Sequence, residues 1–160
     1  PAAGELQIKL EYVGICGSDL HFFDQGRLAN WELDGPLALG HEPGGVVTAI
    51  GEGVTGFEVG DKVAIEPAVP CGKCEACRTG HYNLCPDVKM LAIPHERDGV
   101  FSEYCTHDAT MCYKLPENMD TMEGGLLEPL TVCMEQNFPM PNLVRLQLFL
   151  DVDVSVCVPS

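Results

Sequence analysis

The chain has 160 residues, of which 24 are acidic and 9 are basic, so its formal net charge is −15 at pH 7. This length and a hydrophobic content of 46% suffice for one domain with its own apolar core. The negative charge disfavours nucleic acid and anionic membrane surfaces, and we expect neither as a partner. Residues 1–9 lack the features of a secretory signal and no segment reads as a membrane span, which favours a cytoplasmic protein.

Short β-prone segments separated by glycine and proline dominate the chain. They predict a mainly β fold, a barrel of short strands with a few short helices. Helical signals are confined to residues 16–23, 75–79 and 121–134, and Thr121 with Glu123 is the predicted cap of the last helix. The predicted strands cover residues 6–12, 45–50, 62–65, 99–106 and 111–115.

A first group of metal-binding residue types lies between positions 14 and 45. Cys16 belongs to the segment Gly-Ile-Cys-Gly-Ser-Asp-Leu-His, and His41 and Glu42 belong to Gly-His-Glu-Pro-Gly-Gly. A catalytic zinc needs three protein ligands and one open position, and Cys16, His41 and an acid such as Glu42 supply suitable types. Each residue alone also has an ordinary explanation, since single cysteines usually pack and single histidines usually form hydrogen bonds.

The residues from Gly51 to Gly56 match the pattern G-x-G-x-x-G, which in some proteins binds a dinucleotide. That function requires a helix directly after the glycines, whose N-terminus receives the pyrophosphate. The residues that follow here predict a turn and another strand instead. We therefore interpret this segment as a hairpin turn.

Four closely spaced cysteines form the strongest motif of the chain: Cys71, Cys74, Cys77 and Cys85. Two-residue gaps let successive sulfurs point inward from a tight turn, and Zn²⁺ accepts four thiolates in tetrahedral geometry. The spacing predicts a structural zinc knuckle in a lobe of residues 66–90. Two disulfides are the alternative, but they need an oxidising compartment, and the scattered remainder of the nine cysteines favours a reduced protein.

Residues 135–160 form a β-prone tail. Apolar residues occupy every second position from Val144 to Val158, which predicts one long bent strand or two strands. Such a strand would complete the barrel or pair with another chain, and a tail without a structural role is the alternative.

The order of these motifs resembles that of the zinc-dependent medium-chain dehydrogenases, and most of all the sorbitol and xylitol dehydrogenase branch. The resemblance runs from about residue 10 to about residue 132 and rests on four segments in register. They are residues 16–21, residues 40–42, the four-cysteine motif and Leu127-Glu128-Pro129-Leu130. The resemblance implies that residues 1–134 form a GroES-like β-barrel, the catalytic domain of that family.

The same resemblance implies two zinc sites. Cys16, His41 and Glu42 would bind a catalytic zinc, and Glu128 would lie beside the metal-bound water or act as an alternate ligand. Cys71, Cys74, Cys77 and Cys85 would hold a structural zinc.

Further residues of the family pattern would serve the reaction. Ser18 and His21 would lie on the path of the proton, and Asp19 would orient His41 from behind. The chemistry would be hydride transfer from a secondary alcohol to NAD(P), with zinc as the Lewis acid. Family members continue into a dinucleotide-binding domain, and we expect no such domain and no NAD(P) site within these 160 residues.

Two functions remain open. The first is the catalytic portion of a zinc-dependent polyol or alcohol dehydrogenase, either as a fragment of a larger enzyme or with a nucleotide-binding partner supplied by another chain. The second is a non-catalytic zinc-binding module with a structural or oligomerising role. In either case we expect the 160 residues alone to be inactive as a dehydrogenase, and to form a homo-oligomer through strand edges near the tail.

Overall fold

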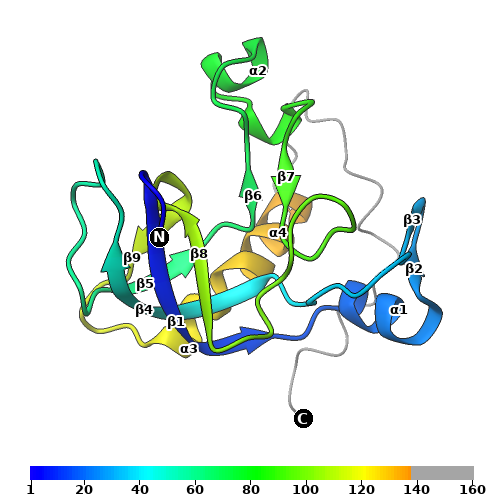
Figure 1. The fold of residues 1–160 in the computed structure, drawn as a ribbon, viewed down its shortest axis with the longest axis horizontal. Coiled ribbons are helices and arrows are strands. Elements are labelled where there is room, and N and C mark those ends of the chain that lie inside the picture. Colours follow the sequence, from blue (N-terminus) through cyan, green and yellow to red (C-terminus); the bar gives the residue numbers. More distant parts are fainter. Residues whose placement is uncertain (138–160) are drawn as a thin grey trace.

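A curled antiparallel sheet of five strands forms the body of the structure, a computed structural model that describes residues 1–137. The strands lie side by side in the order β8–β1–β4–β5–β9, so the first strand of the chain is a central one (Figure 1). Their bounds are β1 (Glu5–Gly14), β4 (Glu42–Ile50), β5 (Lys62–Ile65), β8 (Tyr104–Asp108) and β9 (Cys112–Lys114). The mainly β fold expected from the sequence is confirmed.

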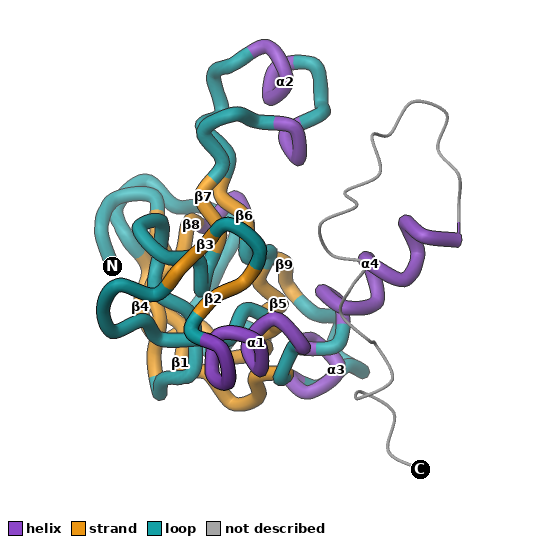
Figure 2. The backbone as a smooth tube through the Cα atoms, turned by 90° about the vertical axis from the view of Figure 1, so that its right-hand side faces the viewer, coloured by secondary structure: helices purple, strands orange, loops and turns teal. Residues whose placement is uncertain are grey.

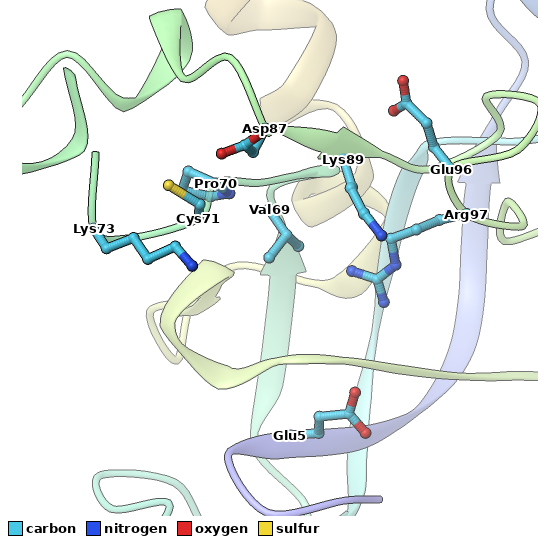
Figure 3. Close-up of a pocket in the computed structure, with 9 residues that line it drawn as sticks. All are labelled: Glu5, Val69, Pro70, Cys71, Lys73, Asp87, Lys89, Glu96 and Arg97. Atoms are coloured by element: carbon cyan, nitrogen blue, oxygen red, sulfur yellow. The ribbon is translucent and has the colours of Figure 1, made fainter. Parts of the chain in front are cut away.

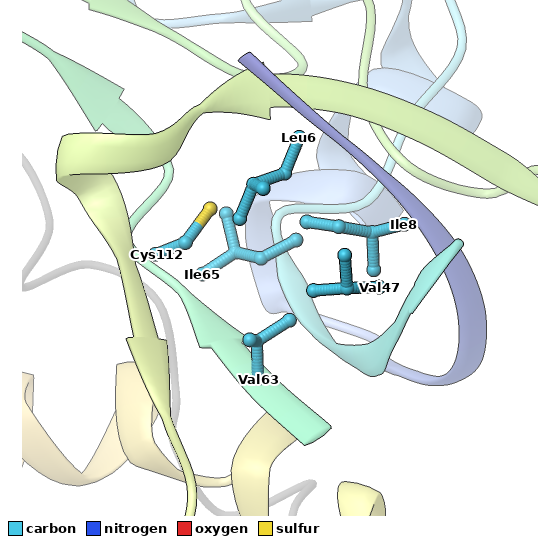
Figure 4. Packing of buried hydrophobic residues seen from close by; sticks show 6 residues of the cluster. All are labelled: Leu6, Ile8, Val47, Val63, Ile65 and Cys112. Atoms are coloured by element: carbon cyan, nitrogen blue, oxygen red, sulfur yellow. The ribbon is translucent and has the colours of Figure 1, made fainter. Parts of the chain in front are cut away.

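The concave side of this sheet holds the apolar core. Leu6 and Ile8 alternate with polar residues along β1, and both are fully buried, because successive side chains of a strand point to opposite faces. The core cluster consists of Leu6, Ile8, Val47, Val63, Ile65 and Cys112, drawn from four of the five strands (Figure 4). Alternate residues of β1 thus face the core.

A small lobe stands apart from the sheet on a two-stranded stem (Figures 1 and 2). The stem pairs β6 (Ala68–Val69) with β7 (Lys89–Met90). Between them the chain forms α2 (Glu75–Arg78) and a single 3₁₀ turn, η1 (Tyr82–Leu84). A second 3₁₀ turn, η2 (Ala109–Met111), links β8 to β9. The predicted helix at residues 75–79 is therefore confirmed within one residue.

The helices other than α2 lie outside the lobe (Figure 1). Helix α1 (Gly17–Gln25) follows β1 directly, and the short strands β2 (Arg27–Leu28) and β3 (Trp31–Glu32) follow it as a hairpin. Helix α3 (Thr121–Gly125) packs on β4 through Gly44, where a methyl group would overlap the carbonyl oxygen of Thr121. Only glycine permits this approach of helix to strand.

The predicted helix over residues 121–134 is two helices, α3 and α4 (Leu127–Asn137), which Leu126 separates. Its cap is Asp120 and not Thr121, because the Asp120 carboxylate accepts from the backbone N–H of Glu123 at 2.8 Å. Pro129 does not end the helical region. It lies in the first turn of α4, where a backbone N–H would have no partner within the helix.

The strand predicted at residues 99–106 lies later in the chain, as β8. Residues 99–101 instead bind the segment before β4, where the N–H of Val100 donates to the carbonyl of Gly40 at 2.9 Å. The Gly51–Gly56 segment is a turn between β4 and β5 with no helix after it, as expected. The predicted strands at residues 144–158 lie outside the described residues. Within residues 1–137, no helix is long and apolar enough to span a membrane.

Candidate metal centres

The four cysteines of the lobe converge on one point. Their sulfur atoms all lie within 4.8 Å of one another, with Cys74 Sγ 3.4 Å and Cys71 Sγ 4.0 Å from Cys77 Sγ. A tetrahedral ion with Zn–S bonds of about 2.3 Å separates its sulfurs by about 3.8 Å, so the arrangement fits zinc. No disulfide joins any cysteine of the described chain.

Backbone N–H groups point at these sulfurs. The N–H of Cys74 donates to Cys71 Sγ at 3.4 Å, that of Cys77 to Cys74 Sγ at 3.5 Å, and that of Cys71 to Cys85 Sγ at 3.4 Å. Donors facing a sulfur favour its thiolate form, and they hold the pKa of Cys71 below the ordinary thiol value. Desolvation and the neighbouring thiols raise the pKa of Cys77 to about 12, so the backbone donors favour the thiolate form at Cys71 and not at all four cysteines.

Tyr82 ties the lobe to the sheet. Its hydroxyl donates to Glu66 Oε2 at 3.1 Å, and the hydroxyl of Tyr113 on β9 donates to the same oxygen at 3.0 Å. Glu66 follows β5 directly, so one carboxylate joins the stem, the lobe and the last strand of the sheet. The sequence gives no signal for this contact, because Glu66 and Tyr113 lie 16 and 31 positions from Tyr82.

The second group lies where β1 ends and β4 begins. Cys16 Sγ, a ring nitrogen of His41 and a carboxylate oxygen of Glu42 lie within 4.8 Å of one another. His41 and Glu42 are 5% and 4% exposed, and Cys16 is half-buried. Thiolate, imidazole and carboxylate are the donor types of a three-ligand zinc site, and three donors leave a fourth position open.

Asp19 holds the two ligand-bearing segments together. This residue of α1 is 3% exposed, and its carboxylate accepts from the N–H of Gly40 at 2.8 Å and from the N–H of Cys16 at 3.0 Å. The same carboxylate lies 3.8 Å from Nδ1 of His41. One buried charge thus fixes the backbone beside both Cys16 and His41.

The surroundings of this group are strongly acidic. Burial raises the pKa of Glu42, and burial also raises the pKa of Cys16 above that of an ordinary thiol. Glu128 on α4 is raised to a pKa of about 7, first by burial and then by the charges of Glu42 and Asp19, which His41 opposes. Several buried acids that cannot all ionise in the metal-free state mark a site that a divalent cation would stabilise.

The other predicted residues lie in different places. Ser18 is buried and hydrogen-bonds to Cys16. His21 Nδ1 lies 3.4 Å from Nε2 of Gln25, one turn further along α1, and His21 does not belong to the three-donor group.

A groove of about 770 Å³ separates the base of the lobe from the sheet (Figure 3). Its charged lining consists of the cations Lys73, Lys89 and Arg97 and the acids Glu5, Asp87 and Glu96. Cys71 is the one residue of the two candidate metal centres that lines this groove. The groove therefore does not include the buried site at Cys16, His41 and Glu42.

The geometry of a GroES-like barrel with two candidate metal centres agrees with the known proteins to which the chain is similar. The pattern of the alcohol dehydrogenase GroES-like domain matches residues 2–117, so the chain belongs to this family. Within the family its relatives are zinc-type alcohol and polyol dehydrogenases, and the resemblance found in the sequence is confirmed.

Three relatives illustrate the likeness. An uncharacterised zinc-type alcohol dehydrogenase-like protein of Escherichia coli K12 is 48% identical over 84% of this chain and 39% of its own. Sorbitol dehydrogenase of Bacillus subtilis is 47% identical over 80% of this chain and 36% of its own. The solved structure of galactitol-1-phosphate dehydrogenase from E. coli shares 33% identity and a TM-score of 0.75, over 84% of this chain and 37% of its own. The chain thus spans less than two fifths of these relatives.

Proposed function

We propose that this chain is the zinc-binding catalytic portion of a dehydrogenase that oxidises a secondary alcohol of a polyol. The observation that carries the proposal is the buried group of Cys16, His41 and Glu42, whose three donor atoms lie within 4.8 Å of one another. A polyol as the substrate class is supported by the names of the relatives, which include sorbitol and galactitol-1-phosphate dehydrogenases.

In this proposal Cys16, His41 and Glu42 hold the catalytic zinc. A bound zinc supplies Lewis acidity, which lowers the pKa of an alcohol and stabilises its alkoxide. Asp19 keeps both ligand segments in place through the N–H groups of Cys16 and Gly40. Glu128 remains close enough to feel the charges of His41 and Glu42, so it is suited to accept a proton or to replace a ligand.

Ser18 and His21 would carry the proton away from the site. Both lie on α1, three residues apart, which places them on neighbouring positions of one helix face. His21 reaches Gln25 near the end of the helix, toward the solvent. Because an imidazole ring can both accept and donate a proton, this residue is suited to exchange protons with water.

The four cysteines of the lobe would hold a structural zinc: Cys71, Cys74, Cys77 and Cys85. Four thiolates leave no open position for a substrate, so this ion stabilises the lobe instead of acting on an alcohol. The eight cysteines described without a disulfide favour a reducing compartment such as the cytoplasm.

The hydride requires an acceptor, and we propose NAD(P). The named sheets of residues 1–137 pair only antiparallel strands, so this part of the chain has no parallel βαβ unit to bind a dinucleotide. In our proposal the acceptor is held by a further domain or by a partner chain, and the 160 residues on their own do not turn over a polyol.

Elemental analysis of the purified chain tests the proposal directly. We expect two zinc ions per chain, and one in the His41→Ala variant. The His95→Ala variant is the control, because its side chain is 70% exposed and lies in no donor group, and it should retain both. Zinc in the lobe alone would argue for a non-catalytic zinc module. If His41→Ala keeps both zinc ions, the site at Cys16, His41 and Glu42 is refuted.

A further inference from the structure

Gly14, the last residue of β1, lies opposite Glu42, the first residue of β4, in the antiparallel register of the two strands. Side chains of directly opposed residues share one face of a sheet, with their Cβ atoms about 4.5–5.5 Å apart. The Glu42 side chain therefore leaves β4 on the face where Gly14 carries only a hydrogen atom.

Glu42 uses the space that this glycine leaves. A methyl group on Gly14 would overlap Oε2 of Glu42 and would lie 3.0 Å from its Cβ and 3.1 Å from its Cδ. Of the glycines in the described chain, Gly14 is the one whose added methyl would meet the side chain of a candidate metal ligand. Its φ is not in the left-handed region, so the crowding comes from Glu42 and not from the backbone of Gly14.

Two glutamates compete for the role of carboxylate ligand. Glu42 belongs to the three-donor group with Cys16 and His41, whereas Glu128 approaches from α4 and lies outside it. Glu42 is 4% exposed and lies on β4 opposite β1, so its side chain has few other rotamers available. The position of its carboxylate therefore depends on the absence of a side chain at Gly14.

We propose that Gly14 is a positioning residue that selects Glu42 as the carboxylate ligand of the second metal site. The proposal rests on the proposed function, since it requires that Cys16, His41 and Glu42 bind a metal. It assigns a task to a residue that carries no donor atom itself. In a Gly14→Ala variant the carboxylate of Glu42 is pushed from the donor group, and water or Glu128 takes its place.

Cobalt titration of the full chain, with zinc kept in the four-cysteine site, measures this effect. Co²⁺ reports its ligands through its visible absorption as well as through its affinity. We expect Gly14→Ala to bind Co²⁺ about 10- to 100-fold more weakly, the range typical of residues that orient metal ligands, with the spectrum of Glu42→Ala. The matched control is Gly35→Ala, since a methyl group there meets nothing within 4 Å and the φ is not left-handed.

The double variant Gly14→Ala, Glu42→Ala separates positioning from a general loss of structure. If Gly14 acts through Glu42, the double variant binds Co²⁺ no more weakly than Glu42→Ala alone, because both changes remove the same ligand. It should also be more stable than Gly14→Ala, because the crowding side chain is gone. If Gly14→Ala does not fold but the double variant does, the clash with Glu42 is established; if neither folds, the proposal is wrong.

Other outcomes distinguish this proposal from the proposed function. Wild-type cobalt affinity and spectrum in Gly14→Ala would overturn the positioning role, and so would additive losses in the double variant. If Glu42→Ala retains cobalt that His41→Ala loses, the metal site stands and the selection of Glu42 fails. A zinc-loaded wild-type chain that takes up no cobalt at all would refute both.

Discussion

Asp19 shows how a buried charge can organise a site without belonging to the donor group. Its two carboxylate oxygens accept from the backbone N–H groups of Cys16, which follows β1, and of Gly40, which precedes β4. The sequence motif predicted that this residue would act on His41. The structure adds two backbone hydrogen bonds. The one from Cys16 follows the capping-box spacing at the start of α1, whereas the one from Gly40 joins residues 21 positions apart and follows from no spacing rule.

Replacing Asp19 with Ala should weaken both the fold and the second metal site. Two backbone N–H groups would lose their acceptor, and a buried donor left without a partner costs about 1–3 kcal/mol. Urea denaturation and cobalt binding measure the two effects. Asp24→Ala, on the exposed side of the same helix, is the control and should change neither. Wild-type cobalt affinity in Asp19→Ala would show that the ligands need no such support.

His107 is another buried polar residue, and it belongs to neither candidate metal centre. It lies on β8, is fully buried, and its Nε2 lies 2.9 Å from the carbonyl oxygen of Glu66. Its Nδ1 has no hydrogen-bond partner within the described chain. Burial, followed by the charge of Arg97, lowers its pKa from 6.5 to about 4. The folded protein therefore keeps this imidazole neutral at neutral pH.

This shift predicts a loss of stability in mild acid. Between about pH 6.5 and about 4 the unfolded chain binds a proton at His107 that the folded chain excludes, so acidification through this window favours unfolding. Between pH 7 and pH 4, we expect the free energy of unfolding to fall by about 1–3 kcal/mol less in His107→Gln than in the wild type. Urea unfolding at a series of pH values gives the difference. His95→Gln, with an exposed ring, should follow wild type; equal slopes in all three proteins would contradict the assignment.

At the scale of the element, the lobe and the sheet behave as separate units that share few contacts. The lobe is joined to the sheet by the β6–β7 stem and by Tyr82 and Tyr113, which meet on Glu66. Its interior has no apolar cluster within the described chain, and none of the six core residues belongs to it. A lobe of this kind depends on its metal for its structure.

Cys74→Ser should therefore release the lobe and spare the sheet. The variant loses one of four sulfurs and one N–H acceptor within the cluster. We expect one zinc less per chain and loss of hydrogen-exchange protection over residues 71–85, while β1 and β4 stay protected. Cys16→Ser is the reciprocal control, which should lose the other zinc and keep the lobe protected. Unchanged zinc content in Cys74→Ser would refute the four-cysteine site.

Element prediction succeeded where the pattern was local and failed where distant residues decide. The strand at residues 62–65 and the turn at residues 51–56 were predicted correctly, because β-prone residues and glycines act over a few residues. The strand expected at residues 99–106 is found at Tyr104–Asp108, as β8, because residues 99–101 form hydrogen bonds with residues 38–40. Asp120 was missed as a cap because the polar residue after it, Thr121, satisfies the same rule.

For the molecule as a whole, the charge of −15 opposes compaction. Raising the ionic strength from about 0.01 M to about 0.15 M shortens the Debye length from about 30 Å to about 8 Å and screens this repulsion. We expect the midpoint of urea unfolding to rise with sodium chloride over this range. A variant with exposed Glu52 and Glu117 changed to Lys should show a smaller rise, and an equal one would mean that repulsion is unimportant.

The donor residues of the candidate sites were easier to predict than the packing that positions them. Residue types and motif order indicated both donor groups, because zinc accepts few side chains and the knuckle spacing is short. The contribution of Gly14 could not be predicted, since it depends on the register that sets Gly14 opposite Glu42 across two strands. Register follows from the packing of the entire sheet and not from either segment alone.

The pairing of β1 with β8 has a consequence for the order in which the protein forms. The knuckle is complete once Cys85 has been synthesised, whereas β1 must wait for residues 104–108 to gain its outer neighbour. Closing the short loop of the knuckle costs less entropy than joining residues some hundred positions apart. We expect a nascent chain to capture its first zinc while the barrel is still open, so that zinc supply during translation decides whether the sheet closes around a folded lobe or an unfolded one.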